Sequence, residues 1–226
     1  MYGEVKRAEE AYMELLALTV GPLEENCYFV IGENRDTIIF DPGAEADEIK
    51  NVIELNDLKP FAIILTHAHY DHIGAVEDIR NTYRIPLYQS SIEKDWLTDS
   101  MMNGSGKHPE MEDVIIEKPA DFYLDTVGQS QVGEFTFEIQ HIPGHSPGSL
   151  VFLFKENGFG VVGDVIFQGT VGRTDFPYGS HESLMEGIKK HIATLPGEFV
   201  LFPGHGSPTT VEQELENNPY LNGRRS

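Results

Sequence analysis

Three of the chain's nine histidines lie within seven residues, in the stretch THAHYDH (66–72). The stretch follows the apolar run FAIIL (61–65), which is typical of a strand buried on both faces. In an extended chain, residues two apart point to the same side, so His67 and His69 can converge on one point. A polar surface turn is the alternative interpretation, and the density of ligand-type side chains after a buried strand disfavours it.

Asp71 and His72 add two more ligand-type side chains to the same stretch. If a helix begins near Asp71, both side chains project from its first turn toward a point beside the two preceding histidines. Imidazole and carboxylate groups are good ligands for zinc, iron and manganese. The stretch therefore predicts part of a metal site.

Three further positions share one pattern: an apolar strand, then glycine, then a single ligand-type residue. They are His145 in HIPGHSPGS, Asp164 in VVGDVIF and His205 in FPGHGSP. Glycine lets the backbone turn tightly and approach an ion closely. The seven ligand-type residues are too many for one tetrahedral zinc and suit two ions bridged by one carboxylate. Two ions about 3.5–4 Å apart lower the pKa of a water between them into the neutral range.

The composition is ordinary for a soluble globular protein, with 40% hydrophobic and 23% charged residues among 226. The formal net charge of −21 disfavours nucleic acid and anionic membranes as partners and favours a small-molecule substrate. No apolar run approaches the roughly 20 residues that span a bilayer, and the charged N-terminus does not resemble a signal peptide. A single cysteine, Cys27, suits a reducing cytoplasm, where we expect the protein. The oligomeric state stays open.

Strands and helices mix along the chain without a linker, which predicts one domain over residues 14–221. Residues 1–13 are expected to form a tail or short helix, and residues 222–226 a C-terminal tail. The predicted strands are residues 14–20, 26–32, 37–43, 61–65, 134–142, 150–154, 160–164 and 198–206. The predicted helices are residues 45–58, 72–83, 91–102, 181–194 and 209–217. Two runs of strands, each followed by helices, favour two packed sheets with helices outside.

The motifs HAHYDH, PGHSPGS, GDVIF and PGHG, in this order, resemble those of the metallo-β-lactamase-fold hydrolase superfamily. The stretch FQGTVGRTDFPYGS (167–180) narrows the resemblance to the glyoxalase II-like (hydroxyacylglutathione hydrolase-like) short-form metallohydrolases and to the persulfide dioxygenases. The resemblance covers roughly residues 14–221. It implies a four-layer αββα sandwich of α+β or α/β class, with the metal ions at one edge between the sheets.

The resemblance also implies a role for each ligand-type residue. His67, His69 and His145 would hold one ion, Asp71, His72 and His205 would hold the second, and Asp164 would bridge the two. The two divalent ions would be zinc, with iron or manganese as alternatives. In glyoxalase II-like enzymes the bridging hydroxide attacks a thioester carbonyl, and Asp71 would help to orient that hydroxide. The expected substrate is a thioester of the hydroxyacylglutathione type or a related small ester.

Two features depart from the family pattern. Longer glyoxalase II enzymes carry a C-terminal helical region whose basic side chains grip glutathione. Here about twenty residues follow His205, and Arg224 and Arg225 are the basic ones among them. Binding of glutathione itself therefore stays open. The cysteine ligand that the commonest zinc β-lactamases have at the position of Asp164 is absent, so antibiotic hydrolysis is not expected.

Two alternatives remain at the level of function. A persulfide dioxygenase would use one iron held by His67, His145 and Asp164, with positions left open for oxygen and substrate. A non-catalytic metal-binding protein that keeps the fold is the other alternative. The identity and number of ions per chain distinguish these possibilities.

Residues outside the ligand set supply further candidates. Arg173 and Asp175 are expected to pair, either supporting the loop after the bridging aspartate or bonding to metal-binding histidines. Tyr178 is a candidate substrate contact at the mouth of the site. Trp96 and the glycine-rich loop over residues 103–106 are candidates for a flap.

The cysteine and the remaining histidines are expected to have structural roles. Cys27 is interpreted as a packed strand residue, and His141 as a packed residue or one that supports a ligand. His108, His181 and His191 are expected on the surface.

Overall fold

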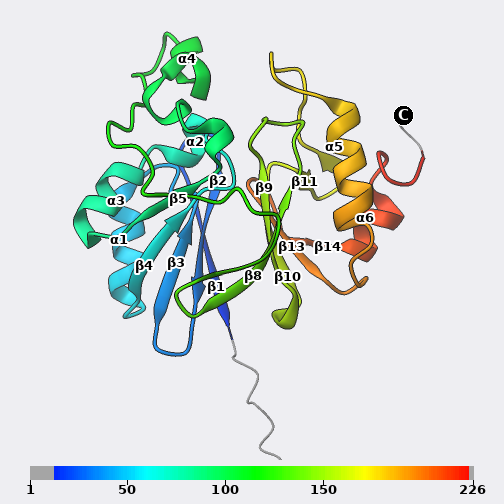
Figure 1. The fold of residues 1–226 in the computed structure, drawn as a ribbon, viewed down its shortest axis with the longest axis horizontal. Coiled ribbons are helices and arrows are strands. Elements are labelled where there is room, and N and C mark those ends of the chain that lie inside the picture. Colours follow the sequence, from blue (N-terminus) through cyan, green and yellow to red (C-terminus); the bar gives the residue numbers. More distant parts are fainter. Residues whose placement is uncertain (1–12, 224–226) are drawn as a thin grey trace, which may run out of the picture.

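The computed structural model describes residues 13–223, which form four layers: helices, a sheet, a second sheet facing the first, and helices again (Figure 1). This arrangement confirms the predicted αββα sandwich in a single domain. Of the tail or short helix predicted over 1–13, all but the last residue lies outside the described residues, as do residues 224–226 of the predicted C-terminal tail. Among the described helices, none has the length and apolar character needed to cross a membrane.

The first sheet has six strands in the order β1-β2-β3-β4-β5-β6. These strands are β1 (Glu14–Val20), β2 (Glu25–Ile31), β3 (Asp36–Phe40), β4 (Lys59–Ile64), β5 (Leu87–Gln89) and β6 (Phe122–Tyr123). The first three strands pair antiparallel, and β3 to β6 pair parallel. Because β3, β4 and β5 run in the same direction, their carboxyl ends meet at one edge of the sheet.

The second sheet also has six strands, in the order β14-β13-β10-β9-β8-β7. These strands are β7 (Gly128–Val132), β8 (Phe135–His141), β9 (Leu150–Phe154), β10 (Phe159–Gly163), β13 (Val200–Pro203) and β14 (Thr209–Thr210). Within this sheet β10 and β13 are parallel, and the other neighbours are antiparallel. A two-stranded ribbon pairs β11 (Ile166–Phe167) with β12 (Thr170–Val171).

Helices α1 and α3 cover the outer face of the first sheet, and α5 and α6 cover that of the second (Figure 1). The α-helices are α1 (Ala46–Leu55), α2 (Tyr70–Ile73), α3 (Val76–Tyr83), α4 (Ser100–Asn103), α5 (His181–Gly187) and α6 (Val211–Asn217). Short 3-10 turns span Ser91–Glu93, Trp96–Thr98, Ser105–Lys107 and Lys155–Asn157. Helix α5 continues as a π-helical turn over Ile188–Ile192.

Two predicted helices differ from the structure. The helix predicted over 72–83 is divided into α2 and α3, because the Ala75 amide donates to the Pro42 carbonyl (2.9 Å) instead of continuing the helix. The single helix predicted over 91–102 is wrong. Asp99 has an extended backbone there, and its carboxylate accepts from two amides in the first turn of α4, so a new helix starts after it.

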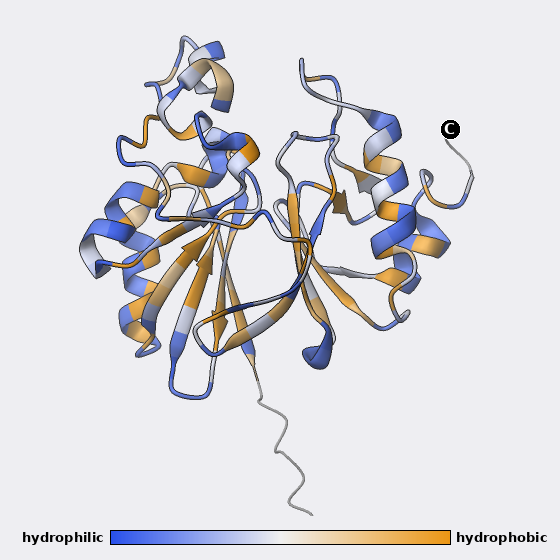
Figure 2. Cartoon of the chain, in the orientation of Figure 1, coloured by the Kyte–Doolittle hydropathy of each residue, from blue (hydrophilic) through white to orange (hydrophobic). Residues whose placement is uncertain are grey.

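Side-chain alternation along the strands produces three apolar layers. In β3, Ile38 and Phe40 pack between the two sheets, whereas Ile39 packs toward the helices on the outer face. Figure 2 shows hydrophobic strands inside and hydrophilic helix faces outside. Full burial of such side chains contributes about 1.5–3 kcal/mol each. Cys27 is fully buried in the apolar layer between the first sheet and its helices, which confirms its interpretation as a packed strand residue.

Candidate metal centre

The first cluster of ligand-type side chains, called here the three-histidine group, is formed by His67, His69 and His145. Their ligand atoms lie within 4.8 Å of one another. The first two follow β4, in the first sheet, and His145 follows β8, in the second. His69 Nδ1 and His145 Nε2 are 2.9 Å apart, so the two sheets meet at this point.

The second cluster, called here the mixed group, is formed by Asp71, His72 and His205. His205 Nε2 lies 3.2 Å from Asp71 Oδ2, and His72 Nε2 lies 3.6 Å from the same oxygen. Helix α2 supplies the first two residues, and the loop after β13 supplies the third. The mixed group therefore also joins the two sheets.

Asp164 lies between the two groups. Its Oδ2 is 3.4 Å from His145 Nε2, in the three-histidine group. Its Oδ1 is 3.5 Å from His72 Nε2, in the mixed group. One carboxylate therefore contacts both groups, which is the arrangement required of a bridging ligand.

The backbone at Gly163 explains how Asp164 reaches this position. Gly163 has φ of +50°, in the left-handed region that favours glycine, and a Cβ there would lie 2.5 Å from Thr66 Oγ1. The end of β10 can therefore approach the loop after β4 only with glycine at this position. The predicted role of glycine, close approach of backbone at the site, applies at this strand end.

The polar atoms that face the centre fit metal ions. His67 Nε2, His72 Nε2 and Asp164 Oδ1 are buried and find no hydrogen-bond partner among residues 13–223. Leaving such atoms unpaired costs about 1–3 kcal/mol each, which coordination to an ion would offset. The donors are nitrogen and oxygen without sulfur, a set that suits zinc, iron or manganese.

Hydrogen bonds behind the histidines orient their rings. His145 Nδ1 donates to the Arg173 carbonyl (3.0 Å), and His205 Nδ1 donates to the Leu23 carbonyl (3.0 Å). Each bond leaves Nε2 turned toward the centre, as expected for metal-binding histidines. His141, expected to be packed or supporting, donates from Nε2 to the Pro147 carbonyl (2.8 Å), within the turn that carries His145.

Asp41 orients the mixed group, and the sequence analysis did not identify it. Its carboxylate accepts from the Thr66 amide (2.7 Å), the Thr66 hydroxyl (2.5 Å) and His72 Nδ1 (3.0 Å). Asp41, His67 and His72 also come within 4.8 Å of one another, but these bonds occupy the Asp41 oxygens, so we assign Asp41 to positioning. Its φ of +48° ends β3 at Phe40, two residues short of the glycine-containing turn. The turn signal in FDPG is the sequence feature that marks this position.

Glu25 is a second buried carboxylate that the sequence analysis did not identify. It lies at the start of β2, and its Oε1 is 3.7 Å from His72 Nδ1. Neither of its oxygens has a hydrogen-bond partner within the described residues. Burial raises its pKa well above the ordinary value, against the opposing effect of His72.

Glu93 is the third missed carboxylate, and it supports the three-histidine group. It is 1% exposed. One oxygen accepts from the amide of Ala68, between His67 and His69, and the other from the amide of Gly148, in the turn after His145, both at 2.7 Å. Burial raises its pKa, and these hydrogen bonds act in the opposite direction. A single side chain thus connects the two loops that carry this group.

Electrostatics differ between the two groups. Burial lowers the pKa of His67 and His145, and lowers that of His69 to about 3, so the three-histidine group is neutral. In the mixed group burial lowers the histidine pKa values, but other effects outweigh it: Asp71 and Asp164 raise the pKa of His72, and the hydrogen bond that His205 donates to Asp71 raises that of His205. Burial raises the pKa values of Asp71 and Asp164, but the nearby His72 lowers them by more, so both pKa values lie below the ordinary value.

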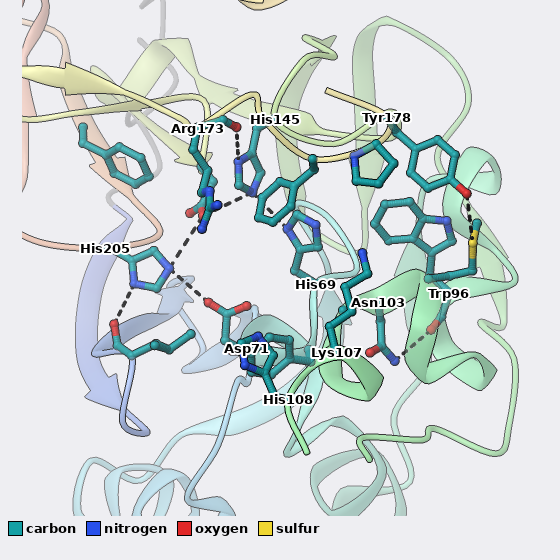
Figure 3. Close-up of a pocket in the computed structure, with 18 of the residues that line it drawn as sticks. His69, Asp71, Trp96, Asn103, Lys107, His108, His145, Arg173, Tyr178 and His205 are labelled. Atoms are coloured by element: carbon teal, nitrogen blue, oxygen red, sulfur yellow. Dashed lines mark hydrogen bonds and ion pairs between the residues drawn. The ribbon is translucent and has the colours of Figure 1, made fainter. Parts of the chain in front are cut away.

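A pocket of about 690 Å³ opens onto this centre (Figure 3). Five of the ligand-type residues line it: His69, Asp71, His145, Asp164 and His205. Its apolar wall comprises Leu23, Trp96, Met102, Phe167, Val171, Phe176, Pro177 and Tyr178. The pocket therefore gives an apolar molecule access to the polar ligand set.

The remaining candidates lie around this pocket. Arg173 and Asp175 form the expected ion pair, with two hydrogen bonds of 2.8 and 2.7 Å, and the pair holds the pKa of Asp175 down to about 2. The bond to His145 comes from the Arg173 main chain, not from either side chain. Tyr178 lines the pocket, donates its hydroxyl to the Met102 sulfur (3.2 Å) and packs against Trp96.

His108 lies on the surface, as expected, with 43% of its side chain exposed; it also lines the pocket, and its ring packs 5.3 Å from that of Tyr70. It comes from the segment after α4, whose path the sequence pattern did not predict. His181 is exposed, as expected, and its ring lies 5.9 Å from that of Tyr220. His191 is half-buried on the π-helical turn, away from the pocket lining.

The fold and the site together define a class of metal-dependent proteins, and comparison with known families identifies it. The profile of the Metallo-beta-lactamase superfamily matches residues 20–205, and the chain belongs to that family. Family membership and the histidine-rich centre make it a metallo-hydrolase of this superfamily.

Two relatives match over nearly their whole length. The chain is 42% identical to the probable metallo-hydrolase YqgX of Bacillus subtilis over 211 residues, which cover 93% of the chain and 99% of the relative. It is 34% identical to the hydroxyacylglutathione hydrolase GloC of Haemophilus influenzae over 218 residues, 94% of the chain and 100% of the relative.

Two solved structures superpose closely. The BLEG-1 B3 metallo-beta-lactamase has a TM-score of 0.90 at 38% identity and covers 93% of this chain and 100% of its own. TTHA1623 in a di-iron-bound form has a TM-score of 0.78 at 32% identity and covers 91% of this chain and 100% of its own.

Proposed function

We propose that this protein is a binuclear metallohydrolase that cleaves a thioester of the hydroxyacylglutathione type or a related small ester. The observation that carries the proposal is the pair of three-residue ligand groups joined by Asp164. The 34% identity to a hydroxyacylglutathione hydrolase supports the choice of thioester. The net charge of −21 supports a small-molecule substrate over nucleic acid, and the single cysteine supports a cytoplasmic location.

The ligand assignment follows the two groups. The three-histidine group would hold one divalent ion, the mixed group would hold the second, and Asp164 would bridge them. We propose zinc, because imidazole and carboxylate donors suit it and its chemistry needs no redox change. Iron is the alternative, supported by the di-iron form of a relative that is 32% identical.

Ions at this centre would act as Lewis acids on a carbonyl and lower the pKa of a water into the neutral range. The protein's own residues do the rest. Asp71 lines the pocket, and its Oδ2 faces His205. This leaves its Oδ1 to accept a hydrogen bond from the attacking water and so to orient it. The apolar wall around Trp96 and Phe176 excludes bulk water and binds the apolar part of the substrate.

A mononuclear persulfide dioxygenase remains the rival from the sequence, with iron at His67, His145 and Asp164. The mixed group argues against it: His72 and His205 lie 3.6 and 3.2 Å from Asp71, and a one-iron site would leave these three residues without a role. A non-catalytic metal-binding protein is disfavoured by the pocket that opens onto the ligands. Likeness to BLEG-1 supports β-lactam hydrolysis as a second candidate activity, against the expectation from the missing cysteine ligand.

The test combines elemental analysis with a substrate panel. Protein purified without added metal should carry two equivalents of zinc and hydrolyse S-lactoylglutathione or another small thioester. A penicillin and a cephalosporin belong in the same panel. One equivalent of iron together with oxygen consumption on glutathione persulfide would replace the proposal with the dioxygenase. Two equivalents of metal without hydrolysis of any thioester or ester would overturn the proposed reaction.

A further inference from the structure

The pocket contains one positively charged side chain that is not paired with an acid. Apart from the ligand-type histidines, three basic residues line it: Lys107, His108 and Arg173. Arg173 is held by Asp175 through two hydrogen bonds and stacks 4.4 Å from the Phe176 ring. His108 Nδ1 lies 3.1 Å from Glu110. Lys107 forms no ion pair and no side-chain hydrogen bond within the described part of the chain.

Lys107 is directed into the pocket. It ends the 3-10 turn Ser105–Lys107, directly after α4. In Figure 3 its side chain extends from this turn toward the pocket interior, and its amine end lies between His69 and Trp96 in that view.

The segment that carries Lys107 is held in place. Asn103 is fully buried, and its side-chain amide donates to the carbonyls of Trp96 (3.1 Å) and Val114 (2.8 Å). Its side-chain oxygen accepts from the amide (3.0 Å) and hydroxyl (2.8 Å) of Ser105. The Lys107 amide donates to the Gly104 carbonyl (3.2 Å). The backbone at Lys107 is therefore fixed relative to Trp96 in the pocket wall.

The charge of the rest of the molecule makes this lysine informative. With a net charge of −21, the surface as a whole repels anions. Lys107 is exposed, so solvent and salt screen its charge, and it acts on an anion only at short range, within the mainly apolar pocket that it lines. Selectivity for an anionic substrate thus depends on the pocket rather than on the surface field.

We infer that Lys107 is the anion-binding residue of the substrate pocket, and that it favours thioester substrates that carry a carboxylate. The thioester part of this inference rests on the proposed function, whereas the charge part does not.

Binding of a non-hydrolysable pair of ligands tests the charge. The probes are S-benzyl-N-acetylcysteine and its carboxamide, titrated calorimetrically into the metal-loaded protein. The wild type should bind the carboxylate about 3- to 10-fold more tightly than the amide. Lys107→Met should abolish this preference, and Lys107→Arg should keep most of it. Lys189→Met is the matched control. Lys189 is exposed on the π-helical turn after α5, so the substitution changes the net charge equally and should leave the preference intact.

Hydrolysis of a matched pair tests the substrate class. S-lactoyl-N-acetylcysteine and its carboxamide are the substrates, and Lys107→Met should raise KM for the carboxylate about 3- to 10-fold at unchanged kcat, with little effect on the amide. A Lys107→Met protein that still prefers the carboxylate probe would overturn the inference and place the carboxylate on the metal ions. If the wild type cleaves neither thioester, the proposed function fails, while the probe titration still decides the role of Lys107.

Discussion

The two ligand groups meet at one carboxylate but are built differently. The three-histidine group consists of neutral imidazoles, with His67 and His145 almost completely buried. The mixed group contains a carboxylate and is more exposed: the side chains of His205 and Asp71 are 26% and 14% exposed, although His72 is fully buried and residues of both groups line the pocket. Burial and neutrality favour tight retention of an ion, whereas exposure favours exchange and substrate access. We therefore expect the first position to serve structure as well as catalysis and the second to face the substrate.

The two groups also differ in the buried carboxylate that holds their ligand residues in place. Glu93 connects the two loops of the three-histidine group through main-chain amides. Asp41 instead bonds directly to the His72 ring in the mixed group and to the Thr66 side chain below it. One group is thus supported through its backbone and the other through a ligand side chain. Each support can be removed separately, which makes the comparison testable.

The largest effect is expected where the groups join. Asp164→Asn keeps the size of the side chain but replaces one of the two oxygens that face the groups. We expect loss of the paired metal centre and a fall in kcat/KM of about a thousandfold or more. Metal content by elemental analysis and thioester hydrolysis are the measurements. Asp175→Asn, outside the centre, is the control, and an active Asp164→Asn enzyme with two ions would contradict the bridging role.

Removal of metal should separate the two groups. Titration with a chelator is expected to proceed in two phases, with the ion of the more exposed mixed group leaving first. His205→Ala should lower the affinity of the mixed group for its ion about 100-fold or more, so that the first phase disappears and one ion stays bound. His145→Ala should lower the affinity of the three-histidine group for its ion by a similar factor. Metal content during the titration reports both phases. Simultaneous loss of both ions in the wild type would show that the groups act as one.

Substitutions of the carboxylates that support the ligands should have smaller effects, and each should weaken a different ion. Glu93→Gln places an NH2 group against a main-chain amide and should weaken the ion of the three-histidine group about 10- to 100-fold. Asp41→Asn should weaken the ion of the mixed group to a similar extent. Each variant should also lose about 1–3 kcal/mol of unfolding free energy without metal. Glu138→Gln, in an outer ion pair, is the control, and equal effects of both variants on both ions would remove the distinction.

The smallest effect is expected at the pocket mouth. Tyr178→Phe removes the hydroxyl that donates to the Met102 sulfur but keeps the ring contact with Trp96. Because the side chain is exposed and distant from the ligand supports, we expect a change in KM below about threefold and unchanged metal content. Steady-state kinetics with a thioester measures it. A loss of metal in this variant would show that the pocket wall and the ligand groups are not independent.

Local sequence patterns were sufficient where the signal is local. The two-residue spacing in THAHYDH, the strand–glycine–ligand pattern and the long apolar strands predicted the sandwich and the seven residues that the structure brings together. They failed at short elements. Strands β5, β6, β11, β12 and β14 have only two or three residues, too few for an alternating pattern to appear. The break between α2 and α3 also depends on a distant partner, the Pro42 carbonyl.

What the sequence determined by itself is therefore the donor chemistry: which side chains can bind an ion, and at which strand ends they lie. What only the tertiary structure decided is the surroundings of those donors. Glu93 reaches amides 25 and 55 residues away, and Asp41 reaches a ring 31 residues away. Lys107 is one lysine among several until the path of its segment directs it into the pocket. Periodicity fixes which face of an element a side chain occupies, but its partner depends on how distant segments pack, and no local spacing records that.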